Sequence, residues 1–230
     1  MALWNPQDYD SWYESPLGRV SGAIEKSLIF SIAGVMPGET ALDAGCGTGI
    51  YAIELARMGA HTAGFDNDPG MLMAARAKAA RAGLAINLLA ADAAAMPFGD
   101  GSFDVALSVG ALCFFEDMDE ALLETKRVLR PGGRCVIGAL NRWSAWALLR
   151  RIKGLFKKTV YERARFLSPP RLKAALTKAG FESVEFSTCL YFLPINSSRY
   201  LRLAERLEAP SRLLCPNAGA FIAASARRPL

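Results

Sequence analysis

A chain of 230 residues, 52% of them apolar, is long enough to bury a substantial hydrophobic core. Its net charge is +5, and no apolar run reaches the roughly 20 residues that a membrane-spanning helix needs. The N-terminus lacks the basic start and apolar centre of a signal peptide, and the five cysteines show no C-x-x-C spacing. We therefore expect a cytoplasmic protein with neither a disulfide framework nor a metal site.

The chain begins with a segment that we expect to pack as an arm on the rest of the protein. Residues 5–18 are polar and aromatic with two prolines, and residues 20–35 then place apolar side chains near one helical face. Pro37 and Gly38 end this helix. The sequence therefore predicts an N-terminal helical arm over residues 1–36.

The most informative stretch is Leu-Asp-Ala-Gly-Cys-Gly-Thr-Gly at residues 42–49. A short apolar run precedes it, and residues 50–58 follow with a helical pattern, which predicts a strand, a tight turn and a helix N-terminus. Glycines permit such a turn and let a ligand approach the backbone, where amide N–H groups at the helix start would face it. The turn itself consists of Gly45, Cys46, Gly47, Thr48 and Gly49.

These residues alone leave two interpretations of the turn open: an ordinary strand–helix connection or a cofactor site. The dinucleotide fingerprint G-x-G-x-x-G is not met, because the third glycine comes one residue early and Ile50 takes its place. A P-loop would need Gly-Lys-Ser/Thr at its end, which is absent. Asp43 precedes the turn, and its carboxylate would repel phosphate but suits the ammonium group of a methionine moiety, directly or through water.

The next two predicted strands also end beside carboxylates. Residues 61–65 lead to Asp66, where a doubly wound sheet presents a carboxylate to a ribose diol. Residues 86–90 lead to Asp92 and Ala93, and Asp92 could accept a hydrogen bond from an adenine amino group. Three strands that each end in an acid or a glycine turn favour a nucleoside-containing ligand over an ordinary turn.

Four motifs then occur in a recognisable order: LDAGCGTG at 42–49, GFDNDPGML at 64–72, AADAAAMPFGDGSFDVALS at 90–108 and ETKRVLRPGGRCVIG at 124–138. With them the chain resembles the class I S-adenosylmethionine-dependent methyltransferases. The similarity is to the branch that includes ubiquinone- and menaquinone-biosynthesis enzymes and many small-molecule methyltransferases. It implies a fold and S-adenosylmethionine as cofactor, with S-adenosylhomocysteine as product, but it does not name the methyl acceptor.

The resemblance implies a doubly wound α/β fold with a Rossmann-like seven-stranded sheet in the order 3-2-1-4-5-7-6, strand seven being antiparallel. It also implies that the arm folds across the cofactor, so that Tyr9 and Tyr13 close over the methionine end and Arg19 meets its carboxylate. Aromatic faces suit a sulfonium, since cation–π attraction is worth ~0.5–2 kcal/mol. Asn67 stands where relatives place a side chain against adenine.

The fourth predicted strand, residues 103–109, points toward the expected methyl group. Ser108 and Val109 lie at its carboxyl end, where ligands bind in open parallel sheets. Many relatives that methylate nitrogen carry an Asn/Asp-Pro-Pro-aromatic motif here, and this chain has none. The sequence therefore disfavours amine and nucleobase acceptors.

The following residues have two possible roles. Phe114 and Phe115 either begin the next helix, with Asp117 as its N-cap, or form a wall of the acceptor pocket. Methyl transfer needs a general base only if the acceptor must lose a proton. Glu116, Asp117 and Tyr191 are candidates for such a base, but none is preferred, so the catalytic residues stay unassigned.

Residues 145–158 form a predicted amphipathic helix in the most basic region of the chain. The apolar face comprises Ala145, Leu148, Leu149, Ile152, Leu155 and Phe156, and the basic face comprises Arg150, Arg151, Lys153, Lys157 and Lys158. The helix either packs its apolar face on the body or caps the acceptor site as a lid. Its basic face could attract an anionic substrate or an anionic membrane. Nucleic acid is disfavoured because only Trp143 and Trp146 offer stacking surfaces.

The rest of the chain completes the expected fold. After a turn at residues 130–133, we expect a strand at 134–139, a helix at 168–179, a strand at 181–188, a helix at 198–207 and a strand at 218–226. The expected organisation is one domain over 1–230, with the arm at 1–36, a cofactor-binding core at 37–140, a basic lid at 141–167, and a C-terminal part at 168–230 that contains an insertion at 194–217.

The sequence therefore predicts a methyltransferase that acts at oxygen or carbon of a small, apolar or lipid-like acceptor. One alternative is a noncatalytic S-adenosylmethionine-binding sensor or scaffold. Another is a nicotinamide-dependent reductase. The expected location is the cytoplasm, with peripheral contact to the inner membrane surface through residues 145–158.

Overall fold

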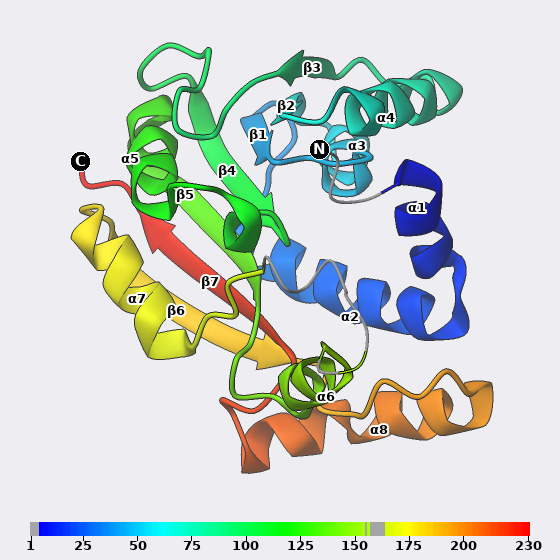
Figure 1. The fold of residues 1–230 in the computed structure, drawn as a ribbon. Helices are drawn as coiled ribbons and strands as arrows, with labels where there is room; N and C mark the ends of the chain where they lie inside the picture. The colour runs from blue at the N-terminus through cyan, green and yellow to red at the C-terminus, as the bar shows by residue number, and fades with distance from the viewer. Residues whose placement is uncertain (1–4, 155, 157–163) are drawn as a thin grey trace.

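The computed structural model describes residues 5–154, 156 and 164–230. Its centre is a seven-stranded sheet in the order β3-β2-β1-β4-β5-β7-β6 (Figure 1). The strands are β1 (Thr40–Ala44), β2 (His61–Asp66), β3 (Asn87–Ala90), β4 (Phe103–Val109), β5 (Leu129–Leu140), β6 (Glu182–Cys189) and β7 (Phe221–Arg227). Strand β7 runs antiparallel to both of its neighbours, whereas the other pairs are parallel. The predicted order and the antiparallel strand are confirmed.

Helices cover both faces of this sheet. They are α1 (Pro6–Glu14), α2 (Pro16–Ala33), α3 (Ile50–Arg57), α4 (Pro69–Arg81), the short 3-10 helix η1 (Leu112–Phe114), α5 (Met118–Val128), α6 (Ala145–Gly154), α7 (Pro169–Lys178) and α8 (Ser198–Leu214). Neighbouring strand residues point to opposite faces. Leu42 accordingly packs in a cluster with residues of α5 and α7, whereas Ala41 packs with residues of α2 and α3.

The N-terminal arm contains two helices, and its long helix begins four residues earlier than predicted. Ser15 caps α2, because its side chain accepts a hydrogen bond from the N–H of Gly18 at 3.0 Å. Pro16 occupies the first helical position, which has no intrahelical partner for an N–H. The polar and aromatic residues before it form α1. The arm is therefore helical over most of its described length.

Several other boundaries differ from the predicted ones. Strand β5 begins at Leu129, which pairs with Phe103 of β4, so the turn expected at 130–133 lies within the strand's bounds. Helix α8 continues past residue 207 and through Pro210. The described part of α6 ends at Gly154, and Leu155, Lys157 and Lys158 lie outside the described residues.

The predicted N-cap of α5 is confirmed, since Asp117 accepts a hydrogen bond from the N–H of Glu120 at 3.0 Å. Ser168 occupies the corresponding position of α7, but its side chain makes no capping hydrogen bond. Helices α6 and α8, which follow β5 and precede β7, are drawn at the same end of the molecule (Figure 1). Across the described ranges, no helix combines the length and apolar character needed to cross a bilayer.

Candidate functional site

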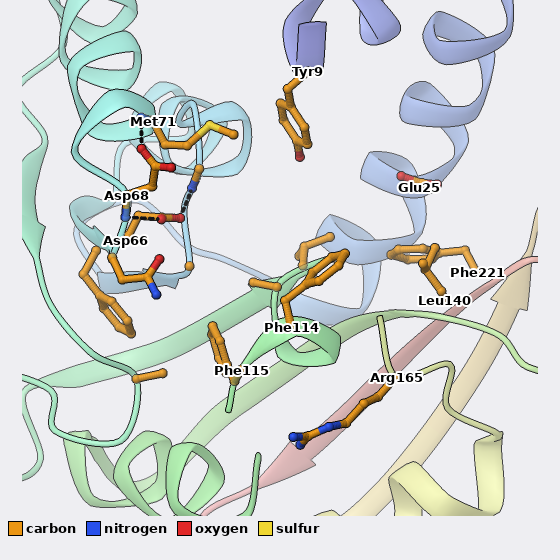
Figure 2. Close-up of a pocket in the computed structure, with 18 of the residues that line it drawn as sticks. Tyr9, Glu25, Asp66, Asp68, Met71, Phe114, Phe115, Leu140, Arg165 and Phe221 are labelled. Carbon is orange, nitrogen blue, oxygen red and sulfur yellow. Dashed lines mark hydrogen bonds between the residues drawn. The ribbon is translucent and has the colours of Figure 1, made fainter. Parts of the chain in front are cut away.

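A cavity of about 820 Å³ opens where the parallel strands end (Figure 2). Gly45, Asp66 and Asp92 line it at or just after the ends of β1, β2 and β3, and Figure 2 draws Phe221 and Arg165 on the opposite side from Asp66. Small-molecule sites in proteins occupy roughly 300–1,000 Å³, and this cavity lies in the upper part of that range.

The glycine turn shapes the floor of the cavity. The N–H groups of Gly45 and Cys46 both donate to the carbonyl oxygen of Phe65, at 2.9 and 2.8 Å, which fixes the turn against β2. Gly45 has a φ of +75°, and an added Cβ would overlap the side chain of Ala111. Gly47 has a φ of +52°, and a Cβ there would meet no protein atom within 4 Å. Because Gly47 lines the cavity, that space is available to a ligand that touches the backbone.

Asp66 holds this turn and faces the cavity. Its carboxylate accepts hydrogen bonds from the N–H of Gly47 at 2.8 Å and from the N–H of Asp68 at 2.9 Å (Figure 2). Burial raises the pKa of the Asp66 carboxyl, although these bonds oppose the shift. The carboxylate predicted for a ribose diol thus stands beside the glycine turn. Asn67, its neighbour, also lines the cavity.

Asp43 lies beneath the turn and is not among the residues that line the cavity. It is only 2% exposed and accepts a hydrogen bond from the N–H of Ala52 at 2.9 Å, in the first turn of α3. Burial raises the pKa of its carboxyl to about 7. The carboxylate expected to meet an ammonium group, directly or through water, therefore makes no direct contact with the cavity and instead anchors the helix start.

The other turn residues tie neighbouring elements together. Thr48 is fully buried and donates to the carboxylate of Asp10 in α1 at 2.7 Å, and Lys78 of α4 bonds the same carboxylate at 2.8 Å. Cys46 packs in a small apolar cluster with residues of α4. Gly49 occupies the N-cap position of α3 with a φ of +80°. These residues position the turn and the arm.

The ends of β3 and β4 complete this side of the cavity. Asp92 and Ala93 line it, and the Asp92 carboxylate accepts a hydrogen bond from the N–H of Ala94 at 2.9 Å. Val109 also lines it, but Ser108 is buried and turned away. The Ser108 hydroxyl finds no hydrogen-bond partner within the part of the chain that is described.

This geometry agrees with the comparisons to known proteins. A family described as a methyltransferase domain matches residues 42–137. A demethylmenaquinone methyltransferase of Thermus thermophilus is 45% identical over 160 residues, which cover 61% of this chain and 73% of that protein. The chain belongs to the class I S-adenosylmethionine-dependent methyltransferases.

Two further similarities show how much of the chain is shared with other proteins. A methyltransferase structure from Thermotoga maritima, reported as a possible histamine N-methyltransferase, has a TM-score of 0.73 and 26% identity, and it covers 99% of this chain and 100% of that one. An uncharacterized protein of Mycobacterium tuberculosis is 32% identical over 194 residues, 84% of this chain. The chain spans 63% of the length of that mycobacterial relative. The family match decides against a nicotinamide-dependent reductase.

The arm of this methyltransferase places two of its three predicted residues at the cavity. Tyr9 and Tyr13 both line it, with ring centroids 5.3 Å apart. Burial raises the pKa of both phenols, so both are protonated at neutral pH. Arg19, expected to meet the cofactor carboxylate, is exposed on α2 and is not a lining residue.

Another wall of the cavity is aromatic. Phe114 and Phe115 line it from η1 and the residue after it, where either a wall or a helix start was predicted (Figure 2). Of the three candidate bases, only Glu116 reaches the cavity. Asp117 caps α5, and the hydroxyl of Tyr191 lies 2.6 Å from that of Thr188, outside the lining.

Helix α6 is oriented differently from the prediction. Trp146 and Ala147 are buried, whereas Leu148 and Ile152 of the predicted inward face are 60% and 46% exposed. Arg150, assigned to the outer basic face, instead lines the cavity and lies over the Trp146 ring at 5.2 Å. Trp146 sets this orientation, because its indole N–H donates to the carbonyl oxygen of Phe192 and its ring fills a buried site.

Besides Asp68, which caps α4, three charged lining residues were not predicted: Glu25 of α2, Arg150 of α6 and Arg165. The Arg165 side chain donates to the carbonyl oxygen of Glu116 at 2.7 Å, beside the aromatic wall. One signal for Glu25 was available, because it is the single acidic residue within α2 and lies among apolar residues. Nothing in the local sequence indicates that these three residues share one cavity.

Proposed function

We propose that this protein transfers a methyl group from S-adenosylmethionine to oxygen or carbon of a small apolar acceptor. The observation that carries this proposal is the contrast within one cavity. One end has a glycine turn, with Phe115 beside Gly45, and the carboxylates of Asp66 and Asp92, and the other has walls formed by Phe114 and Phe221. A nucleoside with an amino-acid tail suits the first end, and an apolar acceptor suits the second.

The residues present fit S-adenosylmethionine. The open space at Gly47 admits a ligand against the backbone, and the Asp66 carboxylate suits a ribose diol. Tyr9 and Tyr13 offer aromatic faces to a positive sulfonium. When bound, the cofactor supplies an already activated methyl group. The protein then has to orient the acceptor and exclude water, and such positioning is worth ~7–11 kcal/mol in well-oriented systems.

The comparisons suggest two acceptor classes. The relative from Thermus thermophilus is named for demethylmenaquinone, and the structure from Thermotoga maritima is reported as a possible histamine N-methyltransferase. The phenylalanine walls of the cavity and the missing Asn/Asp-Pro-Pro-aromatic motif favour an apolar acceptor over an amine. We therefore place phenols and quinols first.

The test is the release of S-adenosylhomocysteine with defined acceptors. Purified protein is mixed with S-adenosylmethionine and a short-chain demethylmenaquinol, 1-naphthol or histamine. We expect turnover with one of the two hydroxylated aromatic compounds and none with histamine. Turnover with histamine alone would overturn the acceptor class. Tight binding of S-adenosylhomocysteine without turnover on any acceptor would favour the sensor or scaffold alternative.

We also propose that the protein contacts anionic membranes in the cytoplasm through α6 and α8. Helix α6 and its flanks expose Trp143, Leu148, Ile152 and Phe156, next to the exposed basic residues Arg151 and Lys153. Helix α8 exposes four leucines, namely Leu203, Leu207, Leu213 and Leu214, and four arginines, namely Arg199, Arg202, Arg206 and Arg212. Apolar side chains flanked by basic ones suit the surface of an anionic bilayer.

Vesicle flotation tests this contact. We expect binding to vesicles of equal parts phosphatidylglycerol and phosphatidylcholine, loss of binding at high salt, and weaker binding of a Leu148→Ser/Ile152→Ser variant. Leu123→Ser, which changes an exposed leucine on α5, is the matched control and should bind normally. Equal binding by all three proteins, or no binding by the native protein, would contradict the proposal.

A further inference from the structure

Glu25 is a buried carboxylate of the cavity that the cofactor end does not use, whereas Glu116, which also lines the cavity, is exposed. Glu25 projects from α2, is only 8% exposed and lines the cavity. Asp66, Asp68 and Asp92 line the cavity too, but each accepts hydrogen bonds from backbone N–H groups. Within the described ranges, the Glu25 carboxylate accepts no hydrogen bond. A buried carboxylate without such a partner is costly unless a ligand supplies one.

The position of Glu25 links it to the acceptor end. In Figure 2 it lies on the same side of the cavity as Phe221 and Leu140, with Asp66 and Asp68 on the opposite side. Charged and titratable groups within electrostatic reach come from four other elements: Tyr9 and Tyr13 of α1, Tyr51 of α3, Arg150 of α6 and Cys189 of β6. Among these only Arg150 carries a positive charge, so Glu25 has one nearby cation and several neutral neighbours.

We propose that Glu25 is the acceptor-side base of the methyl transfer and recognises a hydroxyl group on an aromatic acceptor. This inference rests on the proposed function. The hydroxyl donates a hydrogen bond to the Glu25 carboxylate, which holds the acceptor oxygen beside the aromatic walls formed by Phe114 and Phe221. The same contact orients a quinol whose ring carbon receives the methyl group.

The proton and the electrons balance in this step. Glu25 takes the proton of the acceptor hydroxyl. At the same time, an electron pair of the acceptor oxygen, or of the ring carbon conjugated to it, forms the bond to the methyl carbon. The pair of the carbon–sulfur bond stays on sulfur. The products are the methylated acceptor, S-adenosylhomocysteine and protonated Glu25, which returns its proton to water. On the carbon route, the methylated ring carbon loses its proton to water and the acceptor oxygen takes a proton back from water, which restores the aromatic hydroxyl compound with one net proton released.

The electrostatics of the site suit this role. Burial raises the pKa of the Glu25 carboxyl to about 8, and the charge of Arg150 limits the rise. A general base works best when its pKa lies near the working pH. Arg150 therefore matters as the group that keeps part of the Glu25 population ionised at neutral pH.

Kinetics of Glu25→Gln form the first test, with Glu14→Gln as the control. Glu14 is an exposed acid of the same arm and lies outside the cavity. We expect Glu25→Gln to lower kcat about 100-fold or more, with S-adenosylhomocysteine affinity unchanged. The native kcat should rise with pH, with its midpoint near the raised pKa and a plateau above it, and Glu25→Asp should retain a pH-dependent kcat. A kcat within threefold of the native value, or a loss confined to S-adenosylhomocysteine affinity, would overturn the proposal.

Binding of 1-naphthol in the presence of S-adenosylhomocysteine tests the same contact without turnover. The native protein should bind it more tightly as pH rises from 6 to 8.5, because an ionised Glu25 accepts a stronger hydrogen bond. Glu25→Gln should show weaker, pH-independent binding, whereas naphthalene should bind both proteins equally. Equal 1-naphthol binding by both proteins at every pH would overturn the role of Glu25. If the native protein binds neither compound, the proposed acceptor class fails instead.

Discussion

The two ends of the cavity differ in how their polar groups are satisfied. At the cofactor end, Asp66 and Asp68 accept hydrogen bonds from backbone N–H groups of the turn and of the start of α4. At the acceptor end, Glu25 receives no such bond from the described residues, and Arg150 lies over the ring of Trp146. The carboxylates Asp66 and Asp68 of the cofactor end thus have hydrogen-bond partners before a ligand binds. The acceptor end instead leaves the buried carboxylate of Glu25 to receive a hydrogen bond from the ligand.

This difference separates recognition by the backbone from recognition by side chains. Backbone geometry tolerates few residue types, because positive φ angles favour glycine at Gly45 and Gly47, and a close contact with Ala111 also requires it at Gly45. Side-chain recognition depends on which elements meet, and here they are α2, η1, α6 and β7. Substitutions at the two ends should therefore produce different losses.

The largest effect is expected for Gly47→Leu. Its side chain would occupy the space that a ligand needs, so S-adenosylhomocysteine affinity should fall about 100-fold or more, close to 3 kcal/mol. Isothermal titration calorimetry measures this loss. Gly83→Leu is the matched control, since Gly83 has a φ of +66°, open space around its Cβ position and no place in the cavity lining.

Both leucine variants should lose a similar stability of about 1–2 kcal/mol, because both force a branched residue into the left-handed region. Only Gly47→Leu should lose ligand affinity. Equal S-adenosylhomocysteine affinities in the two variants would show that the glycine turn does not contact the cofactor.

A smaller loss is expected for Asp66→Ala. The substitution removes the acceptor of two backbone N–H groups, at Gly47 and Asp68, together with the carboxylate proposed for the ribose. We expect S-adenosylhomocysteine affinity to fall about 30-fold, near 2 kcal/mol. Asp100→Ala removes an exposed carboxylate outside the cavity and should leave the affinity unchanged. Titrations that give the two variants the same affinity would contradict the role of Asp66.

The comparison also explains what the sequence could predict. The strand order, the glycine turn and the positions of Asp66 and Asp92 follow from short local patterns, because each functional group lies at or just after the end of a strand. The orientation of α6 could not be predicted, because it depends on the contact between Trp146 and Phe192, 46 positions apart in the chain. Helical periodicity alone favoured burying Leu148 and Ile152, which are exposed.

Glu25 was missed for a related reason. A single acid among apolar residues on a helix is usually explained by a solvated edge, and only the packing of α2 beside the cavity shows that this one is buried. Asp43 illustrates the opposite error. Its place before the glycine turn suggested a ligand contact, but the turn folds above it and α3 takes its hydrogen bond.

The pH dependence of stability should show the buried state of Glu25. Its pKa is raised from an ordinary value of 4.5 to about 8, so the folded protein holds this proton more tightly than the unfolded chain. The associated stability is fully present below about pH 4.5 and is lost as the pH rises toward 8. Glutamine does not ionise, so Glu25→Gln should not show this loss.

We therefore expect equal unfolding free energies for the native protein and Glu25→Gln near pH 5, and a more stable variant at pH 8.5. The whole shift corresponds to several kcal/mol, but water in the cavity can solvate the carboxylate, so a difference of about 1–2 kcal/mol is expected. Urea unfolding at several pH values measures it, and Glu14→Gln should follow the native curve. The pKa of Asp43 is also raised, so Asp43 lowers the unfolding free energy as the pH rises. This loss is common to the native protein, Glu25→Gln and Glu14→Gln, and it cancels when their unfolding free energies are compared.

The smallest predicted effect distinguishes a charge contact from simple packing at the arm. Tyr9 lines the cavity, and its aromatic face would attract the positive sulfonium of S-adenosylmethionine but not the neutral sulfur of S-adenosylhomocysteine. Tyr9→Leu should therefore weaken S-adenosylmethionine binding about fivefold, near 1 kcal/mol, and leave the affinity for S-adenosylhomocysteine within twofold of the native value. Tyr9→Phe keeps the ring and should bind both ligands normally. An equal loss for both ligands in Tyr9→Leu would mean that Tyr9 contributes only packing, and the arm would then close the cavity without sensing the charge of the methyl donor.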